Sequence, residues 1–168
     1  MKQLKTLLLA TALCIGTVSF SQAQSKVAHI NTQELISAMP EYKAAQTQLE
    51  TLGKTYQADL QNMSSEYQKK AKQYEAEAPT KTDEENAKRG QELQQMEQNI
   101  RQYNGTAQQD MQKKQEDLLK PITDKAKAAI LKVGRAQGFD YVLDSSVGVT
   151  ILADGKNLLD DVKKELGI

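Results

Sequence analysis

The sequence lacks the residues on which most catalytic and redox sites depend. Its 168 residues include no tryptophan, one histidine (His29) and one cysteine (Cys14). A lone histidine does not supply a catalytic triad or a histidine-rich metal site. Cys14 lies in a segment that we expect to be removed, and lipid attachment there is disfavoured because Leu13 before it is bulky. We therefore predict no catalytic residue, no metal site, no cofactor and no disulfide bond.

Long hydrophobic runs and a dominant charge are also missing once the N-terminus is set aside. Residues 1–23 combine Lys2 and Lys5 with an apolar run from Leu7 to Val18 that is too short to span a bilayer. Ser21-Gln22-Ala23 then offers small residues at the positions that a signal peptidase reads, which is typical of a signal peptide cleaved after Ala23. The mature chain would carry 20 basic and 22 acidic residues, because Lys2 and Lys5 leave with the leader. This balance gives no indication of nucleic-acid binding, and we expect a soluble, exported protein.

The middle of the chain has very few residues that could build a core. Residues 41–120 contain no valine, no phenylalanine, one isoleucine and fifteen glutamines. A stretch this polar, made mostly of helix-forming residues, cannot bury a core of its own. We therefore predict an arm at 41–120 and one small body made from residues 24–40 and 121–168.

The arm should be a hairpin of two long helices. From Tyr42 to Ala78, apolar or small residues recur in ten steps over 36 residues, or 3.6 residues per step. This is the period of a straight helix, which would be about 55 Å long. Thr82 and Glu85 have the spacing of a capping box, so a second helix should begin there and the tip should lie near 79–82.

The body should contain three short strands and further helix. Asn31 predicts an N-cap, and Gly138 predicts a C-cap for the descending helix, inside which Pro121 should cause a kink. Strands are predicted at 26–30, 139–144 and 147–152, with a turn at Ser145 and Ser146 and a final helix from Asn157. The fold class is therefore α+β, a long antiparallel helical hairpin projecting from a small β-rich body. So small a core and so open a sheet favour oligomerisation through the body.

Several segments of the chain resemble the Skp (OmpH) family of periplasmic chaperones. They are Lys26–Asn31, Leu119–Ile122, Gly138–Asp144 and Asn157–Val162, and their order along the whole mature chain is that of the family. The resemblance implies a homotrimer whose bodies meet around a threefold axis and whose arms enclose a cavity. It also implies that this cavity holds unfolded outer-membrane proteins in the periplasm, without ATP or metal.

Three sets of residues are candidates for these roles. Candidates for client binding on the arm are Leu60, Met63, Tyr67, Tyr74, Met96, Ile100, Tyr103 and Met111. Candidates for the body or its oligomer interface are Val27, Ile30, Val142, Leu143, Val149, Ile151, Leu158 and Val162. Gly53, Gly105 and Pro121 are candidate hinges of the arm. Each arm candidate could instead belong to the seam between the two helices, because an antiparallel hairpin must bury some apolar side chains where its helices meet.

Two further questions stay open at the level of sequence. Residues 41–137 carry 16 basic and 15 acidic side chains, so we assign no lipopolysaccharide site. The only basic clusters are at 69–72 and 81–89, and a weak contact of the arm tips with a membrane surface is left open. The alternative function is that of a structural envelope protein whose stiff hairpin bridges or spaces partners. The arm glycines and the absence of a continuous leucine seam favour the chaperone.

Overall fold

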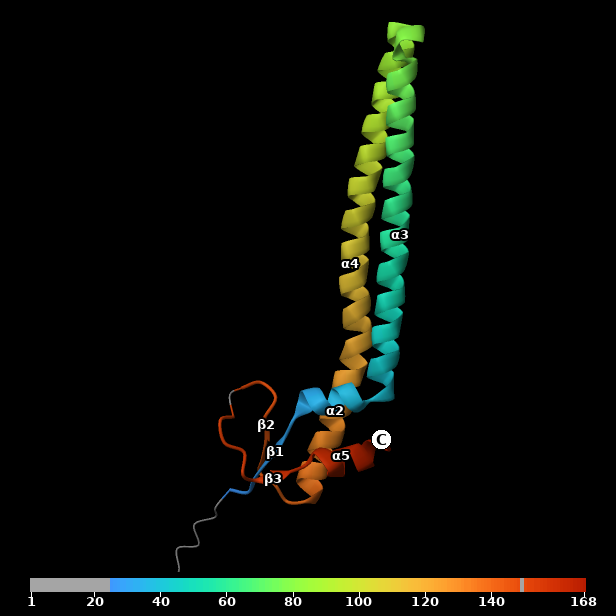
Figure 1. The fold of residues 1–168 in the computed structure, drawn as a ribbon. Coiled ribbons are helices and arrows are strands. Elements are labelled where there is room, and N and C mark those ends of the chain that lie inside the picture. The colour runs from blue at the N-terminus through green and yellow to red at the C-terminus, as the bar shows by residue number, and fades with distance from the viewer. Residues whose placement is uncertain (1–24, 149) are drawn as a thin grey trace, which may run out of the picture.

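The computed structural model describes residues 25–148 and 150–168, which form a small body and one long projecting arm. Figure 1 shows two helices leaving the body side by side and meeting at a distant tip. The elements in chain order are β1 (Val27–Ile30), α2 (Thr32–Ala38), α3 (Pro40–Glu77), the 3₁₀ turn η1 (Ala78–Thr80), α4 (Asp83–Ala136), β2 (Tyr141–Asp144), β3 (Lys156–Asn157) and α5 (Leu159–Leu166). The predicted signal peptide, its cleavage site and Cys14 lie outside the described residues. Within the described residues, no helix is both long and apolar enough to cross a membrane.

The ends of the helices follow from local sequence. The Asn31 side chain accepts a hydrogen bond from the Glu34 backbone N–H (2.9 Å), which confirms the predicted N-cap of α2. Pro40 occupies the first turn of α3, where its missing N–H costs nothing. The capping box at Thr82 is confirmed: its hydroxyl accepts from the Glu85 N–H (3.2 Å), and the Glu85 carboxylate accepts from the Thr82 N–H (3.1 Å).

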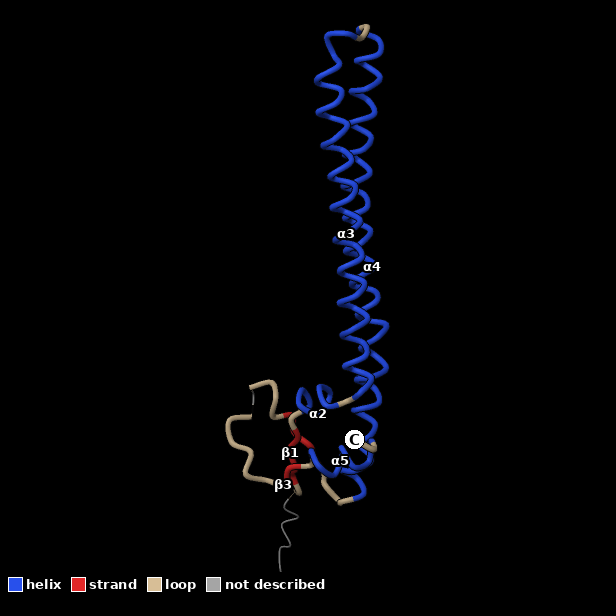
Figure 2. Tube along the Cα trace, turned by 45° about the vertical axis from the view of Figure 1, so that its right-hand side comes forward, coloured by secondary structure: helices blue, strands red, loops and turns tan. Residues whose placement is uncertain are grey.

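Helix α4 belongs to both parts of the molecule. It has 54 residues against 38 in α3, so at 1.5 Å per residue it is about 25 Å longer. Pro121 lies inside it, and the helix runs from the arm into the body without a break. Figure 2 shows its lower end passing beside α5 within the body. Gly138, with φ of +72°, ends α4 as predicted, and its N–H donates to the carbonyl of Arg135 (3.0 Å).

The sheet is parallel and smaller than predicted. Its order is β2-β1-β3, and β1 pairs in parallel with both neighbours. The parallel pairing of β1 with β2 requires a long crossover, which the whole arm supplies. Because only ten of the described residues lie in strands, the body is mostly helical rather than β-rich.

The strand predicted at 147–152 is wrong for the described residues of that segment. They form an irregular loop between β2 and β3, and the third strand is Lys156–Asn157 instead. Both sides of β1 are already occupied, so a strand at 147–152 would have only the outer edges of β2 and of the two-residue β3 to pair with. Figures 1 and 2 show this loop extending away from the helices. The final helix also begins two residues later than predicted, and the side chain of Asn157 accepts a hydrogen bond from the Leu159 N–H (2.9 Å).

The core lies where α2, α4 and α5 pack around β1. Its largest fully buried side chains are Ile30, Leu35, Met39, Leu158 and Val162. Helix α4 contributes mainly small residues, which lets it approach the sheet closely. A Cβ atom on Gly134 would stand 3.0 Å from a methyl carbon of Val142, closer than side chains normally pack. Glycine at this position therefore sets the distance between α4 and β2.

Candidate functional site

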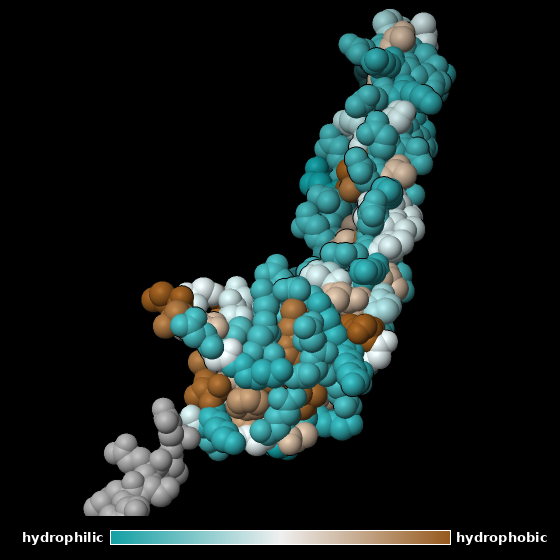
Figure 3. All heavy atoms as spheres, turned by 60° about the horizontal axis from the view of Figure 1, so that its bottom comes forward, coloured by the Kyte–Doolittle hydropathy of each residue, from teal (hydrophilic) through white to brown (hydrophobic). Residues whose placement is uncertain are grey.

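The arm presents its sparse apolar residues along the line where α3 and α4 meet. The eight residues predicted to bind clients are all half-buried, four on α3 and four on α4. Only Ala45 on α3 and Ala107 on the arm part of α4 are fully buried. Figure 3 shows a mostly hydrophilic arm and hydrophobic patches gathered on the body. The arm candidates are therefore partly in the seam and partly at its open edges.

Four tyrosines, which we call the tyrosine ladder, connect the two helices. Each ring donates its hydroxyl to a carboxylate on the opposite helix. The pairs are Tyr56 with Asp110, Tyr67 with Glu97 (2.7 Å), Tyr74 with Glu92 (2.5 Å) and Tyr103 with Asp59 (2.5 Å). Tyr56 and Tyr103 also stack edge to face, with ring centroids 5.9 Å apart. Three of the residues predicted to bind clients, Tyr67, Tyr74 and Tyr103, thus use their hydroxyls in hydrogen bonds between the two helices of the hairpin.

These hydrogen bonds shift the pKa values of the tyrosines. The hydrogen bond to the Asp59 carboxylate raises the pKa of Tyr103 to about 12, because ionisation would place two negative charges together. The bonds to Asp110, Glu97 and Glu92 likewise raise the pKa values of the other three members of the ladder.

The pKa values of the two glutamates in the ladder shift in the opposite direction. Hydrogen bonds from Lys70 and Tyr74 hold the pKa of Glu92 below its ordinary value. At the next contact along the arm, hydrogen bonds from Tyr67 and Arg101 lower the pKa of Glu97. The ladder is therefore most stable when its tyrosines are neutral and its two glutamates, Glu92 and Glu97, are ionised.

The thermal stability of the arm should accordingly fall at both ends of the pH scale. A tyrosine with a raised pKa stabilises the fold fully below the ordinary value of about 10, and this contribution is lost as the pH rises through the folded-state value. A carboxylate with a lowered pKa stabilises the fold above its ordinary value of about 4.3, and this contribution is lost as the pH falls through the folded-state value. We expect the melting temperature, followed by circular dichroism, to be flat between about pH 5 and pH 9 and to fall outside that window.

A matched pair of variants isolates the alkaline part of this prediction. Tyr103→Phe keeps the ring and removes the hydroxyl, so the absorbance change near pH 12 in a spectrophotometric tyrosine titration should shrink by the contribution of one tyrosine. Tyr141→Phe, at a 60% exposed tyrosine of β2, should leave that change at its full size. An undiminished absorbance change near pH 12 in Tyr103→Phe would contradict the assignment.

The basic residues near the tip are mostly paired with carboxylates. Arg89 bonds to Glu77 (2.5 Å) and lies over the ring of Tyr74, 4.6 Å from its centroid. Lys70 pairs with Glu92 across the hairpin, and Lys88 pairs with Glu84 (3.0 Å). These pairs leave little unbalanced positive charge for an anionic surface to bind.

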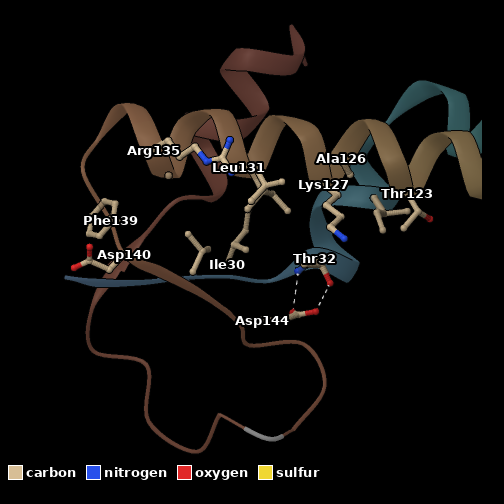
Figure 4. A pocket seen from close by; sticks show the side chains of 14 residues that line it. Ile30, Thr32, Thr123, Ala126, Lys127, Leu131, Arg135, Phe139, Asp140 and Asp144 are labelled. Carbon is tan, nitrogen blue, oxygen red and sulfur yellow. Dashed lines mark hydrogen bonds between the residues drawn. The ribbon is translucent and has the colours of Figure 1, made fainter. Parts of the chain in front are cut away.

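The body carries an open groove that the sequence analysis missed. It has a volume of about 540 Å³ and lies between α4 and the sheet. In Figure 4, Ile30 faces Leu131 across it, and Arg135, Phe139 and Asp140 lie at one end. Ala126 and Gly134 are the small residues of α4 that line it.

Asp144 closes the other end of this groove. Its carboxylate accepts hydrogen bonds from the Thr32 hydroxyl (2.6 Å) and from the Ser146 hydroxyl (2.7 Å) and N–H (2.9 Å). Partial burial alone would raise the pKa of Asp144, but these hydrogen bonds lower it below its ordinary value. The carboxylate thus ties β2 to the start of α2, and the Asp144–Ser146 segment is a structural turn.

The body candidates divide between core and surface. Ile30, Leu158 and Val162 are buried within the chain's own core. Val27 and Leu143 are 43% and 45% exposed, Val142 is half-buried, and Ile151 is 98% exposed. Val149 lies outside the described residues. Only the exposed members of this set are available to another molecule.

The hinge candidates all lie inside continuous helices. Gly53 faces Met111 across the hairpin, where an added Cβ would stand 3.9 Å from the terminal methyl group. An added Cβ at Gly105 would meet nothing within 4 Å, and Pro121 is exposed on α4. Their role as hinges stays a prediction.

The comparisons with known proteins agree with this architecture. Residues 26–166 match the family described as outer membrane protein (OmpH-like), which is not a family of enzymes. The fold matches the crystal structure of an OmpH-like outer membrane chaperone from Caulobacter crescentus CB15, with a TM-score of 0.76 and 19% sequence identity. That match covers 86% of this chain and 85% of the other. No curated protein sequence matches significantly. Because the family match spans nearly all of the described residues, the chain belongs to the OmpH-like family.

Proposed function

We propose that this protein is an ATP-independent periplasmic chaperone that holds unfolded outer-membrane proteins against its arms and prevents their aggregation. The observation that carries the proposal is the arm itself, a long polar hairpin with scattered half-buried apolar residues, projecting free of the body. Many weak contacts of this kind suit clients that must later be released. The OmpH-like family and the fold shared with an outer membrane chaperone support the same role.

The same proposal includes a homotrimer assembled through the body. Three apolar residues of the loop after β2 are strongly exposed: Val147 at 64%, Ile151 at 98% and Leu152 at 75%. Such a cluster is unusual on the surface of a soluble monomer. The open groove between α4 and the sheet offers a second apolar surface on the same body. We propose that the two surfaces cover each other between copies, which would also place three arms around one cavity and raise client affinity by avidity.

The direct test is the solubility of a client. A urea-unfolded outer-membrane barrel protein is diluted into buffer with the mature chain, residues 24–168, and the mixture is sedimented. We expect the barrel protein to stay soluble in a defined complex with about three copies of the chain. If the barrel protein pellets while this chain sediments unchanged, the chaperone proposal fails.

One observation favours a second candidate, a structural spacer that bridges envelope partners. The tyrosine ladder links the two helices at four levels, which stiffens the arm. A spacer would bind one particular partner, whereas a chaperone would hold several unrelated unfolded barrels. Repeating the sedimentation with two unrelated barrel proteins and one unfolded soluble protein distinguishes them.

A further inference from the structure

An uncharged groove lies along one side of the arm, between the middle of α3 and the facing part of α4. It has a volume of about 640 Å³. None of its twelve lining residues is charged, although 26 of the 80 residues in the arm are. The groove therefore differs in chemistry from the rest of the arm.

The groove exists because small residues occupy the seam at this level. Gly53 on α3 leaves open the space next to Met111, and Ala107 on α4 is buried beneath it. Leu60, Met111 and the ring of Tyr56 supply the remaining apolar surface. A larger side chain at position 53 would fill this space.

The rim of the groove is made of amides. Five exposed glutamines line it: Gln57, Gln61, Gln108, Gln112 and Gln115. Each amide group can both donate and accept hydrogen bonds, as each peptide unit does. A polypeptide that buries apolar side chains in the groove would find partners along the rim for its backbone N–H and C=O groups.

We propose that this groove is a binding site for a short, extended and uncharged segment of an unfolded polypeptide, with apolar residues alternating with small polar ones. The inference rests on the proposed function and identifies where and what the arm binds. From Gly53 to Ser64 the groove follows α3 for about 16 Å, the length of about five residues of extended chain. Alternating segments of this kind build the strands of outer-membrane barrels. A charged segment would gain no ion pair from the lining residues.

The test compares two glycine replacements in the same arm. Gly53→Leu places a side chain in the groove, whereas Gly90→Leu places one where an added Cβ meets nothing within 4 Å. Leucine is a better helix former than glycine, so neither variant should lower the melting temperature of the arm. We expect Gly53→Leu to weaken binding of a fluorescein-labelled peptide of alternating leucine and serine at least about tenfold, and Gly90→Leu to change it less than about twofold. Equal binding by the two variants would overturn the proposal.

A second pair of variants tests the charge requirement without touching a glycine. Gln61→Glu adds a charge at the rim, and Gln68→Glu adds the same charge on an exposed part of α3 outside the groove. Only Gln61→Glu should weaken binding of the leucine–serine peptide. A peptide with aspartate at its polar positions should bind the unmodified chain at least about tenfold more weakly than the leucine–serine peptide does. Equal affinity for the two peptides, or equal effects of the two variants, would contradict an uncharged site.

The outcomes separate this inference from the proposed function. If the unmodified chain keeps the barrel protein soluble and Gly53→Leu does so equally well with unchanged peptide affinity, only the groove assignment fails. If the unmodified chain does not hold the barrel protein, the proposed function fails. If Gly53→Leu instead changes the oligomeric state, the groove is a contact between copies of the chain and the proposal is overturned.

Discussion

Replacing Leu35 by alanine is expected to lower the free energy of unfolding by about 2–5 kcal/mol. Leu35 is 0% exposed on α2, and its side chain fills the centre of the body core. Alanine suits a helix, so the loss comes from the cavity and not from the backbone. Because a body of this size has little stability in reserve, denaturant melting should show a large drop in its unfolding midpoint.

Ile168→Ala is the control for this prediction. Ile168 lies beyond the end of α5, is 40% exposed and belongs to neither surface proposed for the trimer contact, so its truncation removes less buried surface and should cost less than about 1 kcal/mol. Both variants are measured at one protein concentration, so that any self-association affects them alike. Equal losses in the two variants would show that the core does not lie where the structure places it.

Replacing Ile151 by aspartate is expected to convert the proposed trimer into monomers. The residue is 98% exposed in a single chain, so the change should cost the fold almost nothing. If a second copy covers Ile151, each contact loses about 2 kcal/mol of apolar burial, and the association weakens about 30-fold per contact. An unpaired carboxylate in such a contact would weaken it further. Sedimentation velocity over a concentration series measures the effect.

Ile168→Asp serves as its control, because Ile168 is 40% exposed beyond the end of α5 and belongs to neither proposed surface. This variant should assemble as the unmodified chain does. An unchanged oligomeric state in Ile151→Asp would place the interface elsewhere. A chain that stays monomeric at every concentration would remove the trimer from the proposal.

The helices could be predicted from sequence because their signals are local. Asn31 and the Thr82–Glu85 pair each satisfy N–H groups within one turn, and Gly138 supplies the positive φ at which α4 ends. The period of 3.6 residues along α3 requires no knowledge of its partner. Such local features do not depend on the tertiary structure around them.

The place of the third strand could not be predicted in the same way. The segment from Val147 to Leu152 has the composition of a strand, but a strand also needs a neighbour with free backbone groups. Within one chain, Lys156–Asn157 takes the free side of β1. Pairing depends on which edges are open, and that information is not contained in the segment itself.

The tyrosine ladder was not predicted from the sequence for a related reason. Tyr67 and Tyr74 lie on the apolar stripe of α3, and from sequence alone they are candidates for client binding or for the seam between the helices. Their carboxylate partners lie 30 and 18 residues further along the chain. Only the register of the hairpin brings each pair together, and sequence periodicity does not fix that register.

The uninterrupted passage of α4 from tip to body has a mechanical consequence. Since the arm is rooted in the body through a continuous helix, no loop interrupts the connection on that side, and any bending has to take place within helical residues, the predicted hinge Pro121 included. The other helix starts at Pro40, directly after the short α2. We infer that the arm works as a cantilever, in which a load at the tip bends the helices gradually along their length and the deflection recovers elastically once the load is removed.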